Sequence, residues 1–479
     1  MLKFDLFING EWVKSSSNDF LPVENPSNEE IIGYVTNATK EDVDYAMSSA
    51  YIAQKKWELV PILERAKYLR KLADLLLEEK EEFAKLITME QGKLYNDALF
   101  EVDDTIAYMT SAIDHINTIK GDILPTAQKD EMVTVEKVPY GVVVALCAWN
   151  YPLALVGRKI GPALITGNTV VLKPHELTPL ATAKFFELVQ KAGLPAGVLN
   201  LITGSGTETG NEMIKNENTR LVTVTGSVRA GQAIYRAAAD NIAGLILELG
   251  GKAPFVVLND ADIDKAVDAA VISRYANCGQ VCICSDMVFV QEDIAEEFTN
   301  KLLKKVAEIK VGDPFDPNTQ MGPKMCRPDL DKIDSIVKRS VEAGAKIEIG
   351  GYRPKGEQFD KGFWYMPTVL TNVTMDMPAA QEEIFGPVLP IIRIKDFDEA
   401  LSTKNKSNFG LACYLFTSDH KIIRRAAREM EVGTLFVNKP IVGYFHVYHS
   451  GHKLSGLGGE DGEYGLNDFL QNRVMYYQY

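Results

Sequence analysis

The sequence lacks the features of a membrane-spanning or secreted protein. Its longest apolar stretch, residues 141–157, is interrupted by Asn150 and Pro152, so we expect no membrane-spanning helix. The first residues of the chain contain no apolar core of a signal peptide. Six cysteines, partly clustered, do not make a disulfide framework in 479 residues. These absences predict a protein of the reducing cytoplasm without a membrane partner.

An excess of positive charge is also missing. The chain has 51 Lys and Arg against 65 Asp and Glu, a net charge of −14, with both signs interspersed. Because nucleic acids are bound by basic faces, we expect no nucleic-acid partner. The glycine-rich segment 204–210 lacks the Lys–Ser/Thr pair of a phosphate-binding P-loop, which excludes nucleotide hydrolysis.

Short apolar runs in the first half of the chain predict a parallel sheet. Five nearly all-apolar runs occupy residues 141–148, 169–172, 198–202, 221–225 and 245–249, with helical stretches such as 180–192 and 231–239 between them. Strands that are apolar on both faces and alternate with helices are typical of a doubly wound sheet, which binds ligands at the carboxyl ends of its strands. Upstream we expect a hairpin over 6–13 with Asn9-Gly10 as its turn, and helices over 41–54, 62–79 and 81–110.

A second alternating series follows Gly250-Gly251. Predicted strands are 255–258, 287–290, 346–349, 388–394, 413–416 and 434–437; predicted helices are 294–309, 330–343 and 421–430. The fold class is therefore α/β, with two doubly wound open sheets. Two further strands, 132–138 and 473–477, lie outside both series and suggest an arm. We expect one domain from residues 1–118 and 140–250, a second from 251–450, and an arm and tail from 119–139 and 451–479.

Three of the six cysteines lie within residues 278–284, between a helix-like segment and a strand-like run. A cysteine at such a turn can be reached by substrate, and exposure and pKa distinguish a reactive cysteine from a structural one. Three interpretations are open from this stretch: Cys282 or Cys284 is a nucleophile, the cluster binds a metal, or the cysteines are small buried hydrophobic residues. A closed zinc site needs four ligands, and no second cysteine pair follows.

Side chains with suitable chemistry fall at the predicted strand ends. Asn150 follows the first sheet strand, Glu248 ends the fifth, and the glycine-rich turn 226–231 opens a helix where a phosphate can bind. A thiolate that adds to a carbonyl needs a donor for the oxyanion, which the Asn150 amide can supply. Oxidation of the adduct needs a nicotinamide, and hydrolysis of the resulting thioester needs a carboxylate such as Glu248. Together these residues predict a thiol-dependent dehydrogenase.

Six motifs stand in one order along essentially the whole chain: Trp149-Asn150-Tyr151-Pro152, Lys173-Pro174, the 226–231 loop, Glu248-Leu249-Gly250-Gly251-Lys252, Gly279-Gln280-Val281-Cys282 and Glu383-Ile384-Phe385-Gly386-Pro387. With this order and spacing the chain resembles the aldehyde dehydrogenase superfamily. The resemblance implies a Rossmann-like cofactor domain, a catalytic domain and a small β arm for oligomerisation. It also implies a homodimer or homotetramer.

The resemblance assigns roles by position. Cys282 is expected to be the catalytic thiol, Glu248 the general base, and Asn150 the oxyanion donor together with the Cys282 backbone N–H. The expected cofactor-binding residues are Trp149, Lys173, Glu176, Gly226, Ser227, Gly231, Leu249, Glu383 and Phe385. The Glu176 carboxylate can bond ribose hydroxyls but repels a 2′-phosphate, so NAD is favoured, although NADP can also be used. No metal is expected.

The substrate is expected to be a small aldehyde. The segments 279–284 and 453–459 look closest to lactaldehyde and glycolaldehyde dehydrogenases, with archaeal glyceraldehyde dehydrogenases as relatives. Expected substrate residues are Arg158, Tyr151, Ile283 and His449, of which Arg158 and His449 could bond the hydroxyl of an α-hydroxyaldehyde. Oxidation would pass through a cysteine thiohemiacetal and thioester to the free acid.

Other functions remain as alternatives. Succinate-semialdehyde dehydrogenase is the first, although Ala276 and Asn277 stand where that enzyme usually carries an arginine. An enzyme that passes the acyl group to coenzyme A generally lacks the base at Glu248, so we expect no coenzyme A. The most distant alternative is a non-catalytic redox or structural protein built on the cysteine cluster.

Overall fold

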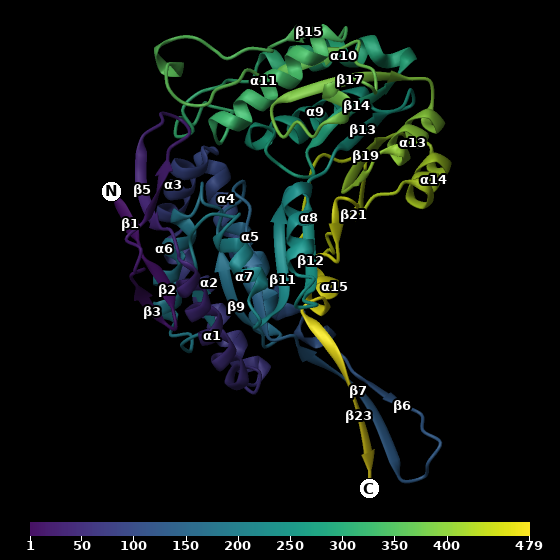
Figure 1. Ribbon diagram of the computed structural model, residues 1–479. Helices are drawn as coiled ribbons and strands as arrows, with labels where there is room; N and C mark the ends of the chain where they lie inside the picture. The colour runs from purple at the N-terminus through teal and green to yellow at the C-terminus, as the bar shows by residue number, and fades with distance from the viewer.

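The computed structural model describes all 479 residues, which form two large sheets, a small N-terminal sheet and a projecting arm (Figure 1). The first large sheet has eight strands in the order β22-β12-β11-β8-β9-β10-β2-β3. Its strands are β2 (Leu6–Ile8), β3 (Glu11–Val13), β8 (Val142–Leu146), β9 (Thr169–Lys173), β10 (Leu199–Leu201), β11 (Thr219–Gly226), β12 (Gly244–Leu249) and β22 (Gly456–Leu457). The five strands from β12 to β10 are parallel, as the apolar runs predict.

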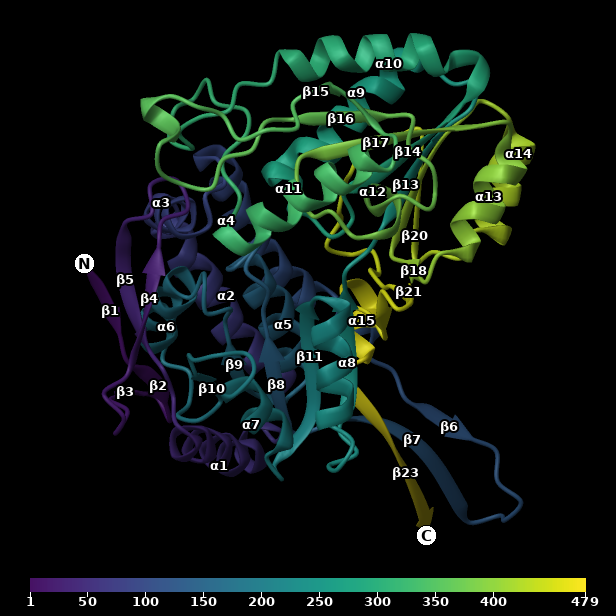
Figure 2. The same cartoon turned by 45° about the horizontal axis from the view of Figure 1, so that its top comes forward.

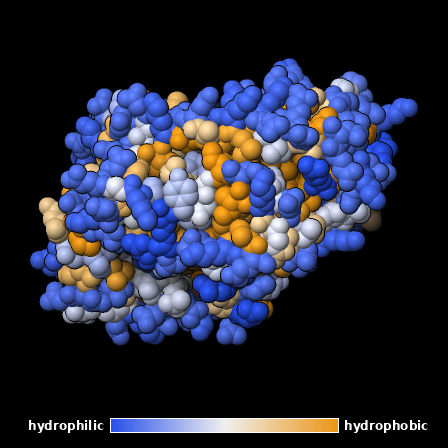
Figure 3. Space-filling model, turned by 90° about the horizontal axis from the view of Figure 1, so that it is seen from above, coloured by the Kyte–Doolittle hydropathy of each residue, from blue (hydrophilic) through white to orange (hydrophobic).

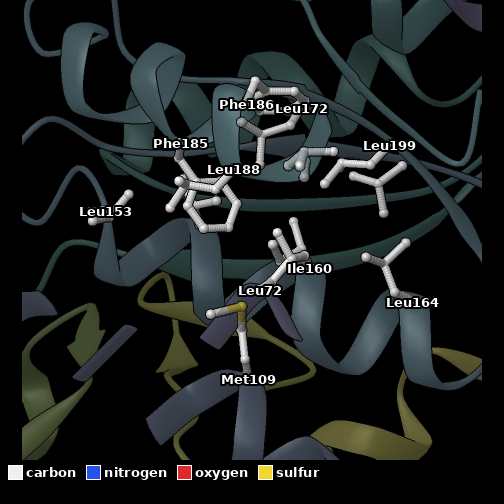
Figure 4. Close-up of a cluster of buried hydrophobic side chains, with 14 of the residues drawn as sticks. Leu72, Met109, Leu153, Ile160, Leu164, Leu172, Phe185, Phe186, Leu188 and Leu199 are labelled. Carbon is white, nitrogen blue, oxygen red and sulfur yellow. The ribbon is translucent and has the colours of Figure 1, made fainter. Parts of the chain in front are cut away.

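Helices cover both faces of this sheet. They are α1 (Lys40–Trp57), α2 (Ile62–Glu78), α3 (Lys80–Gln91), α4 (Tyr95–Asp114), α5 (Ala154–Ile165), α6 (Leu180–Ala192), α7 (Thr209–Lys215) and α8 (Val228–Ala237). Val143 of β8 packs into a core with α2, α4, α5 and α6, part of which is drawn in Figure 4. Its neighbours Val142 and Val144 pack into a second core with α1, α7 and α8. Because successive side chains of a strand point to opposite faces, a strand buried on both faces must be apolar throughout.

The second large sheet has seven strands in the order β15-β16-β17-β14-β13-β19-β20, all parallel except β15. The strands are β13 (Ala253–Val257), β14 (Ser285–Gln291), β15 (Lys346–Ile349), β16 (Thr368–Thr371), β17 (Val388–Ile394), β19 (Ala412–Phe416) and β20 (Thr434–Val437). The helices α9 (Ile263–Tyr275) and α10 (Glu292–Ala307) pack on one core. On the opposite core lie α11 (Arg327–Glu342), α12 (Pro378–Gln381), α13 (Phe397–Lys406) and α14 (His420–Glu429).

The arm is a three-stranded antiparallel sheet of β23 (Leu470–Gln478), β7 (Glu131–Pro139) and β6 (Asp122–Leu124). In both ribbon views it projects away from the two large sheets (Figures 1 and 2). Its large hydrophobic residues are exposed, with Tyr476 at 73% and Ile123 at 77%. An arm of this kind leaves both edge strands, β23 and β6, open to pairing.

The remaining elements are short. The N-terminal sheet pairs β1 (Leu2–Phe4), β5 (Ile31–Thr36) and β4 (Phe20–Glu24); β18 (Phe409–Gly410) pairs with β21 (His452–Lys453). Helix α15 (Gly462–Asn467) follows in the tail, and 3-10 turns occupy Ile116–Thr118, Ala276–Gly279 and Glu357–Phe359. No helix is long and apolar enough to cross a membrane. On the face shown in Figure 3, hydrophobic residues gather in the middle and hydrophilic ones surround them.

Several details differ from the sequence prediction, and three of them concern the two large sheets and their helices. The helix expected over 81–110 is two helices, because Gly92 ends α3 with φ of +82° and a Cβ there would lie 2.8 Å from Pro26 and Pro323. Strand β16 was not predicted. Residues 456–457 of the predicted tail form β22, which pairs with β12 and so belongs to the first sheet. We propose the two large sheets as the two domains, with β22 added to the first.

Candidate active site

A cavity of about 1450 Å³ lies between the carboxyl ends of the first sheet and the cysteine loop of the second. Every site residue predicted above lines it, with the single exception of Gly231. The cavity exceeds the roughly 300–1000 Å³ of a site for one small molecule, which gives room for two ligands side by side. The structure therefore brings together residues that are more than a hundred positions apart in the chain.

A strained turn carries Cys282 into this cavity. After α9 the chain makes a 3-10 turn in which Asn277 and Cys278 have left-handed φ of +46° and +56°. Gly279 continues the turn at +72°, and a Cβ there would lie 2.3 Å from the Gly386 oxygen. Such conformations persist where the surroundings determine them: the buried Gln280 donates to the Asn277 oxygen and accepts from Met325 N. Packing against the 383–386 loop therefore determines the backbone conformation of this turn.

Burial separates the three cysteines of the cluster. Cys278 and Cys284 are 1% and 4% exposed, and the Cys284 thiol donates to the Ser273 oxygen at 2.6 Å. Cys282 is half-buried and lines the cavity. Burial raises the pKa of its thiol to about 11, although the charge of Arg158 opposes the rise. No group of three or more His, Cys, Asp or Glu side chains is placed to hold a metal ion. Cys282 is thus the cysteine of the cluster that a substrate can reach.

Asn150 is held beside the cysteine loop. Its Nδ2 donates to the Gln280 oxygen at 3.0 Å, which leaves its second amide hydrogen available. The Asn150 backbone oxygen accepts from Lys93 Nζ at 3.0 Å, and Lys93 forms a fully buried ion pair with Glu101. The sequence does not predict this pair, and its only signal is the charged Lys93 directly after Gly92. The pair fixes the segment that presents the Asn150 amide.

Glu248 ends β12 with a buried carboxyl group. Neither oxygen has a hydrogen-bond partner, and His449 Nε2 lies 3.3 Å from Oε2. Burial, reinforced by the Glu460 charge, raises the pKa of Glu248 well above its usual range. Burial lowers the pKa of His449 to about 3, so its imidazole is neutral. The neutral imidazole does not form an ion pair with Glu248, so the carboxyl group stays available to exchange a proton with a cavity water.

The predicted cofactor residues line the other part of the cavity. Lys173 Nζ lies 3.4 Å from Glu176, whose other oxygen accepts from Gly206 N at 3.4 Å. Ser227 caps α8, and the backbone at this helix N-terminus faces the cavity together with Gly226. These groups suit a ribose and a pyrophosphate.

Gly231 does not line the cavity, and its place in the phosphate loop stays a prediction. A Cβ at Gly231 would lie 2.5 Å from the Leu249 side chain. The glycine instead lets α8 pack closely on β12. It acts on the site only through the placement of that helix.

The 383–386 loop closes the cavity. Phe385 packs edge-on against Trp149 with ring centroids 5.4 Å apart, and its backbone oxygen accepts from Lys324. Glu383 Oε1 accepts from Gly251 N at 3.0 Å. Burial, together with the charge of Asp286, raises the pKa of Glu383 to about 7. An aromatic wall and a carboxylate suit a nicotinamide ring and its ribose.

A buried carboxylate, Asp286, ties the site loops together. It accepts from Arg274 Nη1 and from Lys252 Nζ, each at 2.6 Å, and from Ile384 N at 3.3 Å. These donors belong to α9 before the cysteine loop, to the segment after Glu248, and to the 383–386 loop. All three charged residues are at most 4% exposed.

We expect Asp286→Ala to lower the free energy of unfolding by about 3–5 kcal/mol, because it leaves two buried cations unpaired. Urea unfolding followed by circular dichroism measures the change. As a matched control, Asp264→Ala removes an exposed carboxylate that pairs with Lys301 and should leave the midpoint nearly unchanged. Equal midpoints for Asp286→Ala and the control would refute the role of Asp286 in holding the site loops together.

Arg158 does not stand free for a substrate hydroxyl as predicted. Its guanidinium pairs bidentately with Asp461, and its Nε lies 3.2 Å from Glu460. Both carboxylates come from the tail, and no pattern in the sequence indicates that this segment lies beside Arg158. Tyr151, Ile283 and His449 also line the cavity, and their contact with substrate stays a prediction.

The chain as a whole matches a known protein family. Residues 12–475 match the model of the aldehyde dehydrogenase family. The chain belongs to that family. It is therefore an NAD(P)-dependent aldehyde dehydrogenase, and its α/β fold is that of the solved relatives.

Individual aldehyde dehydrogenases resemble the chain over nearly its full length. It is 42% identical over 476 residues, 99% of each chain, to 3,6-anhydro-alpha-L-galactose dehydrogenase of Vibrio sp.. It is 37% identical to lactaldehyde dehydrogenase of Escherichia coli, over 99% of this chain and 98% of that one. A solved structure of 3,6-anhydro-L-galactose dehydrogenase in complex with NAP superposes with a TM-score of 0.97, at 44% identity and 99% coverage of both chains. Other aldehyde dehydrogenases at 36–38% identity are named for D-glyceraldehyde, glutarate semialdehyde and succinate semialdehyde.

Proposed function

We propose that this aldehyde dehydrogenase oxidises a small α-hydroxyaldehyde, such as lactaldehyde, glycolaldehyde or glyceraldehyde, to the free acid. The observation that carries the proposal is the half-exposed Cys282 in a cavity shared with the Asn150 amide and the unpaired Glu248 carboxyl. The relatives named for lactaldehyde and D-glyceraldehyde support the substrate class.

In this mechanism the Cys282 thiolate adds to the aldehyde carbon to form a thiohemiacetal. The Asn150 amide and the Cys282 backbone N–H donate to the oxyanion. Because the raised pKa keeps the thiol protonated near neutral pH, addition requires transfer of its proton to a base in the cavity. A bound nicotinamide supplies the acceptor for the hydride lost from the adduct.

The second half of the reaction releases the acid. Glu248 takes a proton from a water molecule, which attacks the thioester on Cys282. The thiol is regenerated, and no coenzyme A is required. A panel of lactaldehyde, glyceraldehyde, glycolaldehyde and succinate semialdehyde, assayed with NAD and with NADP, tests the proposal. Formation of acid without coenzyme A is the expected result, and strict dependence on coenzyme A would contradict it.

We propose NAD as the better cofactor, because the Glu176 carboxylate stands beside Lys173 where a 2′-phosphate would lie. The expected result is a higher kcat/KM with NAD. Glu176→Gln removes the repelling charge and exposes the Lys173 cation, so it should raise the NADP/NAD ratio of kcat/KM by about tenfold. Glu208→Gln, an exposed neighbour, is the matched control. A wild-type preference for NADP would overturn this assignment.

We also propose a homodimer or homotetramer in the cytoplasm. The open edges of β23 and β6 and the exposed tyrosines of the arm favour pairing with another subunit. All six cysteines are free thiols, which supports a reducing compartment.

A further inference from the structure

Arg158 on α5 lines the cavity together with Cys282, and two carboxylates engage its charge. Asp461 binds its Nε at 2.9 Å and its Nη2 as well, a bidentate pair. Glu460 lies 3.2 Å from Nε, and the Tyr108 ring covers the guanidinium at 5.3 Å. The Arg158 side chain is only 10% exposed. A planar guanidinium held in this way has little capacity left for a second carboxylate.

The charges around this pair also balance. Glu460 is fully buried and accepts from Lys159 Nζ at 2.6 Å and from the Thr223 hydroxyl. Two cations thus face two carboxylates, with no net positive charge. Asp104 adds a further carboxyl group to the cavity wall. Lys439 is exposed and lies 3.3 Å from the Tyr444 hydroxyl, at a position that water screens.

The tail that supplies both carboxylates is fixed to the substrate residues. His449 and Glu460 exchange two backbone hydrogen bonds of 2.8 Å, so the carboxylates and His449 are positioned together. Asp461 has φ of +69°, a conformation that Asn tolerates as well as Asp. The backbone therefore holds the Asp461–Arg158 pair in a fixed position in the cavity wall.

We propose that Asp461 determines the substrate class: by occupying Arg158 it excludes aldehydes that carry a distant carboxylate and favours uncharged, hydroxylated aldehydes. The carboxylate of such an aldehyde would meet the Asp461 carboxylate instead of a free cation, and like charges repel. A hydroxyl group instead donates to the Asp461 carboxylate. This inference rests on the proposed function, since it concerns the same cavity.

The test uses the full-length enzyme with one cofactor and three aldehydes: glyceraldehyde, succinate semialdehyde and propionaldehyde. We expect wild-type kcat/KM to be about 100-fold higher for glyceraldehyde than for succinate semialdehyde. Asp461→Asn keeps the side-chain shape but frees the Arg158 charge. It should raise kcat/KM for succinate semialdehyde by about tenfold or more and lower that for glyceraldehyde. Propionaldehyde, which has neither group, should change little.

Glu463→Gln is the matched control, because it removes an exposed carboxylate two residues away that does not contact Arg158. A wild-type preference for succinate semialdehyde would overturn the proposal, even if the variant did not fold. So would an Asp461→Asn enzyme whose substrate ratios equal those of the control. If wild type prefers glyceraldehyde while the Asp461→Asn ratios equal those of the control, only this inference is wrong. If wild type prefers succinate semialdehyde or oxidises none of the three aldehydes, the proposed function fails and this inference with it.

Discussion

Cys282→Ala should abolish aldehyde oxidation while cofactor binding is retained. Cys278 and Cys284 do not line the cavity, and Cys147, which does, is only 6% exposed, so we expect kcat to fall by at least about 10⁴-fold. The substitution removes one atom from a half-exposed side chain and leaves the cofactor contacts of Lys173, Glu176 and α8 intact. Absorbance of the reduced cofactor measures the rate, and isothermal titration with NAD measures binding.

Cys284→Ala is the matched control. Cys284 lies two residues from Cys282 but is buried, and its thiol donates to the Ser273 oxygen. Loss of this hydrogen bond should cost about 1 kcal/mol of stability and leave kcat within a few-fold of wild type. If the Cys284→Ala enzyme folds but is as inactive as Cys282→Ala, the assignment of Cys282 as the nucleophile is wrong.

Glu248→Gln should separate the two halves of the reaction. Addition of the thiol and oxidation can proceed once, but the thioester then lacks a base to activate water. We expect a rapid burst of about one equivalent of reduced cofactor per active site, followed by a steady rate about 10²–10⁴-fold below wild type. Stopped-flow absorbance records both phases.

The control for this variant is Glu463→Gln, whose carboxylate is exposed and outside the cavity. It should show neither the burst nor the loss of rate. Steady turnover of Glu248→Gln near the wild-type rate would remove Glu248 from the mechanism.

The alternation of apolar runs and helices was enough to predict the parallel strands. Val142, Val143 and Val144 must all be apolar because the sheet is covered on both faces, and such runs are visible without a structure. The break at Gly92 was not predicted, because a glycine within an amphipathic pattern does not reveal the two prolines that crowd it. Edge elements such as β22 were also missed, since two residues show no periodicity.

The convergence of Asn150 and Glu248 could be predicted from the sequence. Asn150 follows one predicted strand and Glu248 lies at the end of another, and parallel strands end at one edge of a sheet. The partners of Arg158 were not predictable, because Asp461 is 303 residues away and stands in a tail without a strong pattern. The same holds for the buried pair of Lys93 and Glu101. Contacts of this kind depend on tertiary packing, which no local pattern encodes.

The most direct test of the central claim is to locate the acyl group. Glu248→Gln enzyme is mixed with NAD and glyceraldehyde, quenched in acid, digested and mapped by tandem mass spectrometry. Trypsin leaves Cys278, Cys282 and Cys284 in one peptide between Arg274 and Lys301, so fragmentation must assign the site. The account predicts a glyceroyl thioester on Cys282, in an amount equal to the reduced cofactor formed. An acyl group on Cys278 or Cys284, or reduced cofactor with no acylated cysteine, would contradict it.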